Sequence, residues 1–199
     1  MAELTFTYGT MAAGKSTLAL QLCWQLREGR CDVGLWTFGD RSDDGMVTSR
    51  IGIEAMAEAV EPGSDITSNI ERLVADGVNI LVIDEVQFAS VDQVDALARL
   101  VDERDVDVHA FGLSADFLLN IFPGSARLFA IADWAHELPL TSSCWCGRKG
   151  RCNARIVNGV VAREGDQFFH GDVNAGVVHY QVLCRTHYRR GQLHAEPSP

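Results

Sequence analysis

Residues 4–16 read LTFTYGTMAAGKS, a short run of β-forming residues followed directly by a glycine-rich loop. Leu4–Tyr8 alternates apolar and polar side chains, which predicts a strand, and Thr17–Arg27 then shows helical spacing of leucines. Between them, Gly9–Ser16 fits the pattern G-x-x-x-x-G-K-[ST] in its expected setting of strand before and helix after. Such a loop turns backbone N–H groups and the positive end of a helix toward phosphate oxygens. The stretch therefore predicts a nucleoside triphosphate site.

The loop assigns different tasks to its backbone and its side chains. Lys15 is predicted to supply a point charge to the outer phosphates, and the Ser16 hydroxyl to ligate magnesium. Because the backbone N–H groups bind the phosphates, the alanines of the loop are compatible with phosphate binding. The predicted phosphate-binding residues are Gly9, Thr10, Met11, Ala12, Ala13, Gly14, Lys15 and Ser16.

A second acidic motif follows an apolar run at Asn79–Ile83, which is typical of a strand buried on both faces. The run ends in Asp84-Glu85, so Asp84 is predicted at the carboxyl edge of the sheet, where it can hold magnesium. Adjacent side chains of a strand diverge, so Glu85 is expected to point away from Asp84 and to act as a base. The alternative for Glu85 is an ordinary solvated carboxylate at a strand end.

The rest of the first 141 residues alternates strand and helix patterns. Strands are predicted at Val33–Phe38 and Val106–Leu113, and helices at Val91–Arg104 and from about Ser64. Residues 40–52 are polar, with two glycines, and predict a mobile loop. The alternation predicts an α/β fold resembling that of P-loop NTPases, with a mainly parallel sheet and helices on both faces.

The composition changes after about Thr141, where Gly, Cys and Arg become frequent. Asn158-Gly159 between two apolar pairs predicts a hairpin turn. We therefore expect an α/β domain over residues 1–141, a small zinc-binding lobe over 142–190 and a frayed tail over 191–199.

Two close pairs of metal-binding residues flank this hairpin, which is the arrangement of a closed structural zinc site. The predicted ligands are Cys144, Cys146, Cys184 and His187. The spacing alone leaves Cys152 as a competing fourth ligand, and reduced cysteines without metal as the alternative. Cys23 and Cys31 fall in the core pattern and are predicted to be packed thiols.

The charge and hydropathy of the chain exclude some partners. With 27 acidic and 17 basic residues the 199-residue chain carries a formal charge of −10, which disfavours a nucleic-acid surface. No signal-peptide pattern is evident, and no apolar run approaches the roughly 20 residues of a membrane helix. These features predict a cytoplasmic protein.

Taken together, the motifs resemble the thymidine kinase family, of the zinc-containing cytosolic type and its bacterial branch, over about residues 3–190. The resemblance is carried by four further blocks: Ser49-Arg50-Ile51-Gly52, Asp84-Glu85-Val86-Gln87-Phe88, Gly112-Leu-Ser-Ala-Asp116-Phe117, and Cys144-Trp-Cys146-Gly-Arg-Lys with Cys184-Arg-Thr-His187-Tyr188. It implies that Glu85 is the catalytic base, that Val86 and Gln87 belong to the binding block, and that Cys146 is preferred to Cys152.

The resemblance also predicts the acceptor side. Phe117 is expected to pack on the thymine ring, and a loop at about residues 170–180, ending in Tyr180, to cover the nucleoside. This loop departs from the family pattern because its usual glycine pair and short charged stretch are replaced by a longer segment. The resemblance further implies a homotetramer inhibited by thymidine triphosphate.

The predicted reaction is transfer of the γ-phosphate of ATP to the 5′-hydroxyl of thymidine, with deoxyuridine as a second substrate. Ser16 and Asp84 would organise Mg²⁺, and Arg41 or Arg50 would reach developing phosphate charge unless both are ordinary solvated arginines. One alternative is a P-loop ATPase in which Glu85 activates water. Another is a zinc-bearing regulatory module that binds nucleotide without turning it over.

Overall fold

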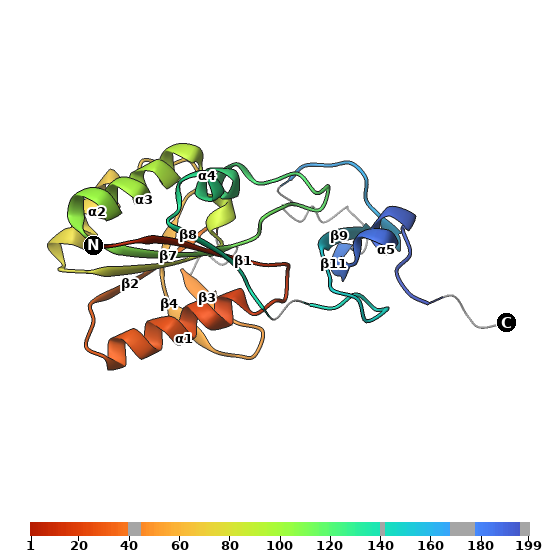
Figure 1. Cartoon of the computed structure of the whole chain (residues 1–199), viewed down its shortest axis with the longest axis horizontal. Coiled ribbons are helices and arrows are strands. Elements are labelled where there is room, and N and C mark those ends of the chain that lie inside the picture. Colours follow the sequence, from red (N-terminus) through yellow and green to blue (C-terminus); the bar gives the residue numbers. More distant parts are fainter. Residues whose placement is uncertain (40–44, 140–141, 168–177, 196–199) are drawn as a thin grey trace. The chain divides into compact units, whose positions relative to one another are not determined.

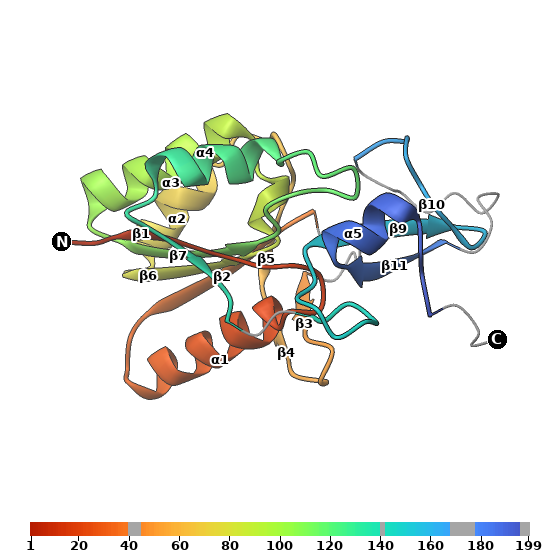
Figure 2. The same cartoon turned by 45° about the vertical axis from the view of Figure 1, so that its right-hand side comes forward.

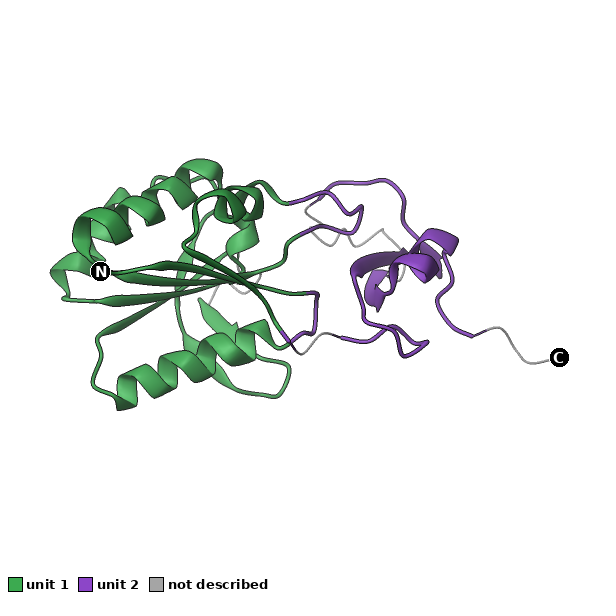
Figure 3. Cartoon of the chain, in the orientation of Figure 1, with its two compact units in different colours: residues 1–9, 14–114, 122–138 green, residues 10–13, 115–121, 139–199 purple. Residues whose placement is uncertain are grey.

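The computed structural model describes residues 1–39, 45–139, 142–167 and 178–195. The chain forms two compact units (Figure 3). Unit 1 comprises residues 1–9, 14–114 and 122–138, and unit 2 comprises 10–13, 115–121 and 139–199. Whether the chain divides into domains at residue 142 stays a prediction, because unit 2 also takes two short segments from the N-terminal part of the sequence.

Unit 1 is built on a six-stranded sheet in the order β5-β2-β6-β7-β1-β8 (Figure 1). Every neighbouring pair in this sheet is parallel. The strands are β1 (Leu4–Tyr8), β2 (Val33–Phe38), β5 (Glu58–Val60), β6 (Ile80–Asp84), β7 (Asp107–Gly112) and β8 (Trp134–Glu137). The predicted α/β fold with a parallel sheet is confirmed.

Helices cover both faces of the sheet (Figure 2). They are α1 (Lys15–Glu28), α2 (Thr67–Ala75), α3 (Val91–Arg104) and α4 (Pro123–Ile131). Side chains alternate along β6, so Leu81 and Ile83 join the core under α2, α3 and α4, while Val82 joins the core under α1. That second core includes Cys23, a packed thiol whose pKa is raised to about 11 by burial. The apolar run at 79–83 is therefore a strand buried on both faces.

The predicted loop at residues 40–52 is partly wrong. Met46–Thr48 forms strand β3, which pairs antiparallel with β4 (Glu54–Met56). Val47 is buried in the core under α1, which supplies the apolar contact that holds this short hairpin. Residues 40–44 lie outside the described residues.

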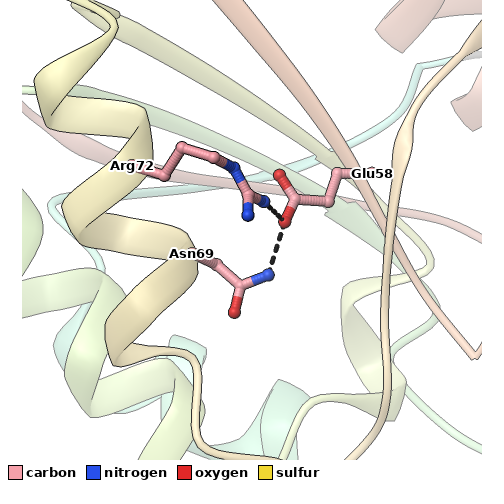
Figure 4. A network of polar contacts seen from close by, with 3 residues as sticks. All are labelled: Glu58, Asn69 and Arg72. Atoms are coloured by element: carbon pink, nitrogen blue, oxygen red, sulfur yellow. Dashed lines mark hydrogen bonds and ion pairs between the residues drawn. The ribbon is translucent and has the colours of Figure 1, made fainter.

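Helix α2 starts slightly later than predicted, at Thr67 rather than near Ser64. The Asp65 carboxylate accepts hydrogen bonds from the Thr67 backbone N–H and hydroxyl, which stabilises the turn before the helix. Asn69 and Arg72 of α2 both contact the Glu58 carboxylate on the edge strand β5 (Figure 4). These contacts join α2 to the edge strand of the sheet.

Unit 2 contains a three-stranded antiparallel sheet in the order β10-β9-β11. Its elements are β9 (Cys152–Val157), β10 (Val160–Val161), β11 (Val178–Leu183) and helix α5 (Arg185–Arg190). The predicted turn is confirmed: Asn158 and Gly159 have φ of 51° and 80° and connect paired strands.

None of the helices in the described part of the chain combines the length and apolar character that a membrane-crossing segment requires.

Candidate active site

The glycine-rich loop begins where β1 ends and finishes where α1 begins. The Gly9 N–H donates to the Gly112 carbonyl at 3.3 Å, which ties the start of the loop to β7. Gly14 has a φ of 87°, a left-handed conformation that L side chains rarely adopt, and the helix starts at the next residue. The tip of the loop, Thr10–Ala13, belongs to unit 2.

Lys15 is buried, with 7% of its surface exposed, among the acidic residues at the end of β6. Burial lowers the pKa of Lys15, while the nearby Glu85 and Asp84 carboxylates oppose this shift. The ammonium group of Lys15 thus places a positive charge in a buried site, where a phosphate anion can bind to it. The exposed Arg50 also acts on the Lys15 pKa, lowering it, so Arg50 lies within electrostatic range of this group. Arg41 lies outside the described residues.

Asp84, the last residue of β6, is 3% exposed. Burial and the neighbouring Glu85 raise the pKa of Asp84 to about 6, against the opposing effects of a hydrogen bond with Ser16 and of the Lys15 charge. Its Oδ1 atom is buried and has no hydrogen-bond partner in the described structure. A buried carboxylate oxygen without a partner, next to a serine hydroxyl, is a donor set that fits Mg²⁺.

Glu85 does not continue the strand, and the predicted reason for its direction is wrong. Its φ of 54° and ψ of 32° are left-handed, so the side chain is directed by a turn rather than by strand alternation. A 3₁₀ turn, η1 (Val86–Phe88), follows at once. A non-glycine residue held in this conformation requires support from its surroundings.

The Gln87 side chain, two residues later, contacts the Glu85 carboxylate. Gln87 is 1% exposed; its Oε1 accepts from the Leu113 backbone N–H at 2.9 Å, and its Nε2 donates to the Glu85 carboxylate. Gly112 leaves room for the amide, since a Cβ there would lie 2.8 Å from Gln87 Oε1. The sequence placed Gln87 in the binding block but did not predict that it orients Glu85.

Unit 2 brings together the four predicted metal ligands. The ligand atoms of Cys144, Cys146, Cys184 and His187 all lie within 4.8 Å of one another. His187 Nδ1 lies 3.3 Å from Cys144 Sγ and 3.5 Å from Cys184 Sγ, and the Cys146 and Cys184 sulfurs are 4.0 Å apart. Tetrahedral Zn²⁺ with ordinary bond lengths needs about 3.8 Å between sulfurs and about 3.5 Å between sulfur and nitrogen.

Two further observations bear on this cluster. A hydrogen bond from the His187 backbone N–H lowers the pKa of Cys184, which favours the thiolate form that metals require. Cys152, the competing ligand, is not part of the group and packs in the apolar core of unit 2.

The two predicted base-contacting aromatic residues are joined by a buried arginine, Arg155 of β9. Its guanidinium lies 3.7 Å from the centre of the Phe117 ring, and its Nε donates to the Tyr180 hydroxyl at 2.8 Å. Arg155 also donates to the carbonyls of Asp166 and Gln167, at 2.9 and 3.3 Å. Residues 168–177, most of the predicted nucleoside loop, lie outside the described residues.

Sequence reasoning missed Arg155, and it also missed Asn153, two residues earlier on β9. Both are buried, with 4% and 7% of their surfaces exposed. The available signal was weak: polar side chains alternating with Cys152, Ala154 and Ile156 just before the predicted hairpin turn. Only the fold reveals that Asn153 and Arg155 contact segments far away in the sequence.

Comparison with known proteins gives a consistent result. Residues 2–188 match the family model described as thymidine kinase. The chain is 46% identical over 195 residues to a thymidine kinase of Cutibacterium acnes, covering 96% of this chain and 90% of the relative. It is 43% identical over 194 residues to that of Streptomyces avermitilis, with the same coverage. It is 37% identical over 200 residues to that of Mannheimia succiniciproducens, covering 98% and 100%. The chain belongs to the thymidine kinase family, as its motifs predict.

Proposed function

We propose that this chain, an ATP-dependent thymidine kinase, transfers the γ-phosphoryl group of ATP to the 5′-hydroxyl of thymidine with Glu85 as the base. Deoxyuridine is a second acceptor in this proposal. The observation that carries it is the group formed by buried Lys15 and Asp84 with half-buried Ser16 and Glu85, after the ends of β1 and β6.

The donor half of the mechanism follows from these side chains. Lys15, which lies near the Glu85 and Asp84 carboxylates, binds the β- and γ-phosphates through its ammonium group. The backbone N–H groups of the loop bind the other phosphate oxygens. Ser16 and Asp84 would hold Mg²⁺, which supplies charge neutralisation on the phosphates when bound. Arg50 adds a second cation to the same part of unit 1.

Glu85 accepts the proton of the attacking hydroxyl. Gln87 keeps its carboxylate in one orientation, so little motion is needed when the acceptor arrives. Because phosphoryl transfer passes through a loose transition state, this positioning and the surrounding positive charge supply most of the catalysis.

The acceptor half is assigned to unit 2. Phe117 and Tyr180 contact the base, and their common neighbour Arg155 holds both in place. A structural Zn²⁺ bound by Cys144, Cys146, Cys184 and His187 stabilises this unit; the ligand distances support it. A homotetramer, inhibition by thymidine triphosphate and a cytoplasmic location are carried over from the family resemblance and stay predictions.

The test compares Glu85→Gln with Glu103→Gln, an exposed residue of α3. We expect Glu85→Gln to bind ATP as the wild type does and to lose about 10²–10⁴-fold in kcat for thymidine phosphorylation, because general-base catalysis contributes that much. Glu103→Gln should be unchanged. Near-normal turnover by Glu85→Gln would contradict the base assignment, and substantial ATP hydrolysis without nucleoside would favour the ATPase alternative.

A further inference from the structure

Met11, at the tip of the glycine-rich loop, is held by two side chains of unit 2. Its backbone N–H donates to Asn153 Oδ1 at 2.8 Å, and its carbonyl accepts from the Ser142 hydroxyl at 2.9 Å. All three residues belong to unit 2. Both backbone polar groups of one loop residue are therefore paired with residues more than 130 positions away in the sequence.

Asn153 is well placed for this task. It lies on β9, where its strand partner is Val182 of β11. The flanking residues Cys152 and Ala154 pack in the core of unit 2, so alternation turns Asn153 to the opposite side of the strand. The side chain is 7% exposed, and its Nδ2 donates to the Ala115 carbonyl at 3.4 Å, which leaves Oδ1 for Met11.

Ser142 is held by a backbone hydrogen bond of its own. Its carbonyl accepts from the Gly150 N–H at 2.9 Å, and a Cβ on Gly150 would come within 2.3 Å of the same oxygen. This close approach fixes the backbone that carries the Ser142 hydroxyl. The Asn153 and Ser142 side chains thus bind the N–H and the carbonyl of the same loop residue, Met11.

A phosphate-binding loop works because its N–H groups are already aligned when the anion arrives. Thr10–Ala13 has one internal backbone contact among the described residues, from the Ala13 N–H to the Thr10 carbonyl at 3.3 Å. The Met11 N–H, one of the loop donors predicted to bind phosphate, donates to Asn153 Oδ1 in this structure. This hydrogen bond ties the tip of the loop to β9, and a fixed tip would keep the neighbouring N–H groups in one direction.

We propose that Asn153 and Ser142 are positioning residues for the phosphate loop. Through these two residues, unit 2 sets the affinity for ATP. Unit 2 then serves the donor as well as the acceptor. This inference rests on the proposed function, because it requires that Gly9–Ser16 bind the triphosphate of ATP.

The test measures ATP dissociation constants by calorimetry without nucleoside, together with melting temperature and zinc content. Ser142→Ala and Asn153→Ala should each weaken ATP binding roughly 2- to 10-fold, the effect of losing one net hydrogen bond. Ser142→Thr keeps the hydroxyl and should bind ATP like the wild type. Ser143→Ala is the matched control, since Ser143 is exposed and its side chain makes no hydrogen bond in the described structure.

ATP affinities within twofold of wild type for both alanine variants, with zinc retained, would overturn the inference. A weakening by Ser142→Ala that Ser142→Thr does not restore would also overturn it, because the hydroxyl would then not be the cause. If Asn153→Ala loses zinc, the ATP affinities of Ser142→Ala and Ser142→Thr decide whether the inference holds. Failure of the wild type itself to bind ATP would instead refute the proposed function.

Discussion

The contact between Gln87 and Glu85 can be tested with a nearly isosteric change, Gln87→Glu. A glutamate at position 87 keeps an oxygen to accept from the Leu113 N–H, so the bond to the end of β7 survives. It replaces the amide that donates to Glu85 with a second carboxylate oxygen. The substitution therefore removes one charge-assisted hydrogen bond and adds a like charge beside the base.

The size of the effect follows from the bond that is lost. A hydrogen bond to a charged group contributes about 1.5–3 kcal/mol. If that free energy holds the Glu85 carboxylate in its orientation, its loss lowers kcat roughly 10- to 100-fold, at about 1.4 kcal/mol per tenfold. Repulsion between the carboxylates adds to the loss.

The assay is steady-state ADP release with saturating ATP and thymidine, accompanied by the melting temperature. Gln25→Glu adds the same charge at an exposed position of α1 and should leave kcat unchanged. A kcat for Gln87→Glu within twofold of wild type, in a folded protein, would refute the view that Gln87 orients the base.

Three other predictions concern stability. Gly124→Ala places a Cβ 2.5 Å from the Ala89 carbonyl, so it should cost about 1–3 kcal/mol and lower the melting temperature; an unchanged value would mean that α4 shifts freely. Burial lowers the pKa of His109 below its ordinary 6.5, against the opposing charge of Asp107, so the free energy of unfolding should be steady above that pH and fall as the unfolded chain protonates below it. Urea titrations of His109→Gln should lack this component; an identical pH profile would contradict it. Cys144→Ser, or zinc chelation, should lower the melting temperature and weaken nucleoside binding, and no change in either would count against a structural zinc.

The sequence predicted those parts of the fold that depend on local patterns. Three elements were predicted correctly because their signals lie in consecutive residues: the strand at Leu4–Tyr8, the helix at Val91–Arg104 and the Asn158-Gly159 turn. The signals are hydrophobic periodicity for the strand and helix, and residue type for the turn. Strand β3 was missed because three residues cannot show a period, and the pairing with β4 and burial of Val47 decide its conformation.

The same division applies to the candidate site. Lys15, Ser16, Asp84 and the four clustered Cys and His residues follow from motifs with fixed spacing. The left-handed turn at Glu85 has no local sequence signal, and the contact of Gln87 with the end of β7 joins residues 26 positions apart. Arg155 has no motif, and its role depends on long-range contacts with Phe117 and Tyr180.

The anchoring of Met11 also has a consequence for the order in which the protein is made. The loop leaves the ribosome early, whereas Ser142 and Asn153 are added 131 and 142 residues later. At about 5–20 residues per second, roughly 7–28 s separate the synthesis of Met11 from that of Asn153. A nascent chain can assemble most of its parallel sheet within that interval while the tip of the loop still lacks both anchors. On the proposal that these anchors position the loop, full competence to bind nucleotide is among the last properties that a newly made chain would acquire.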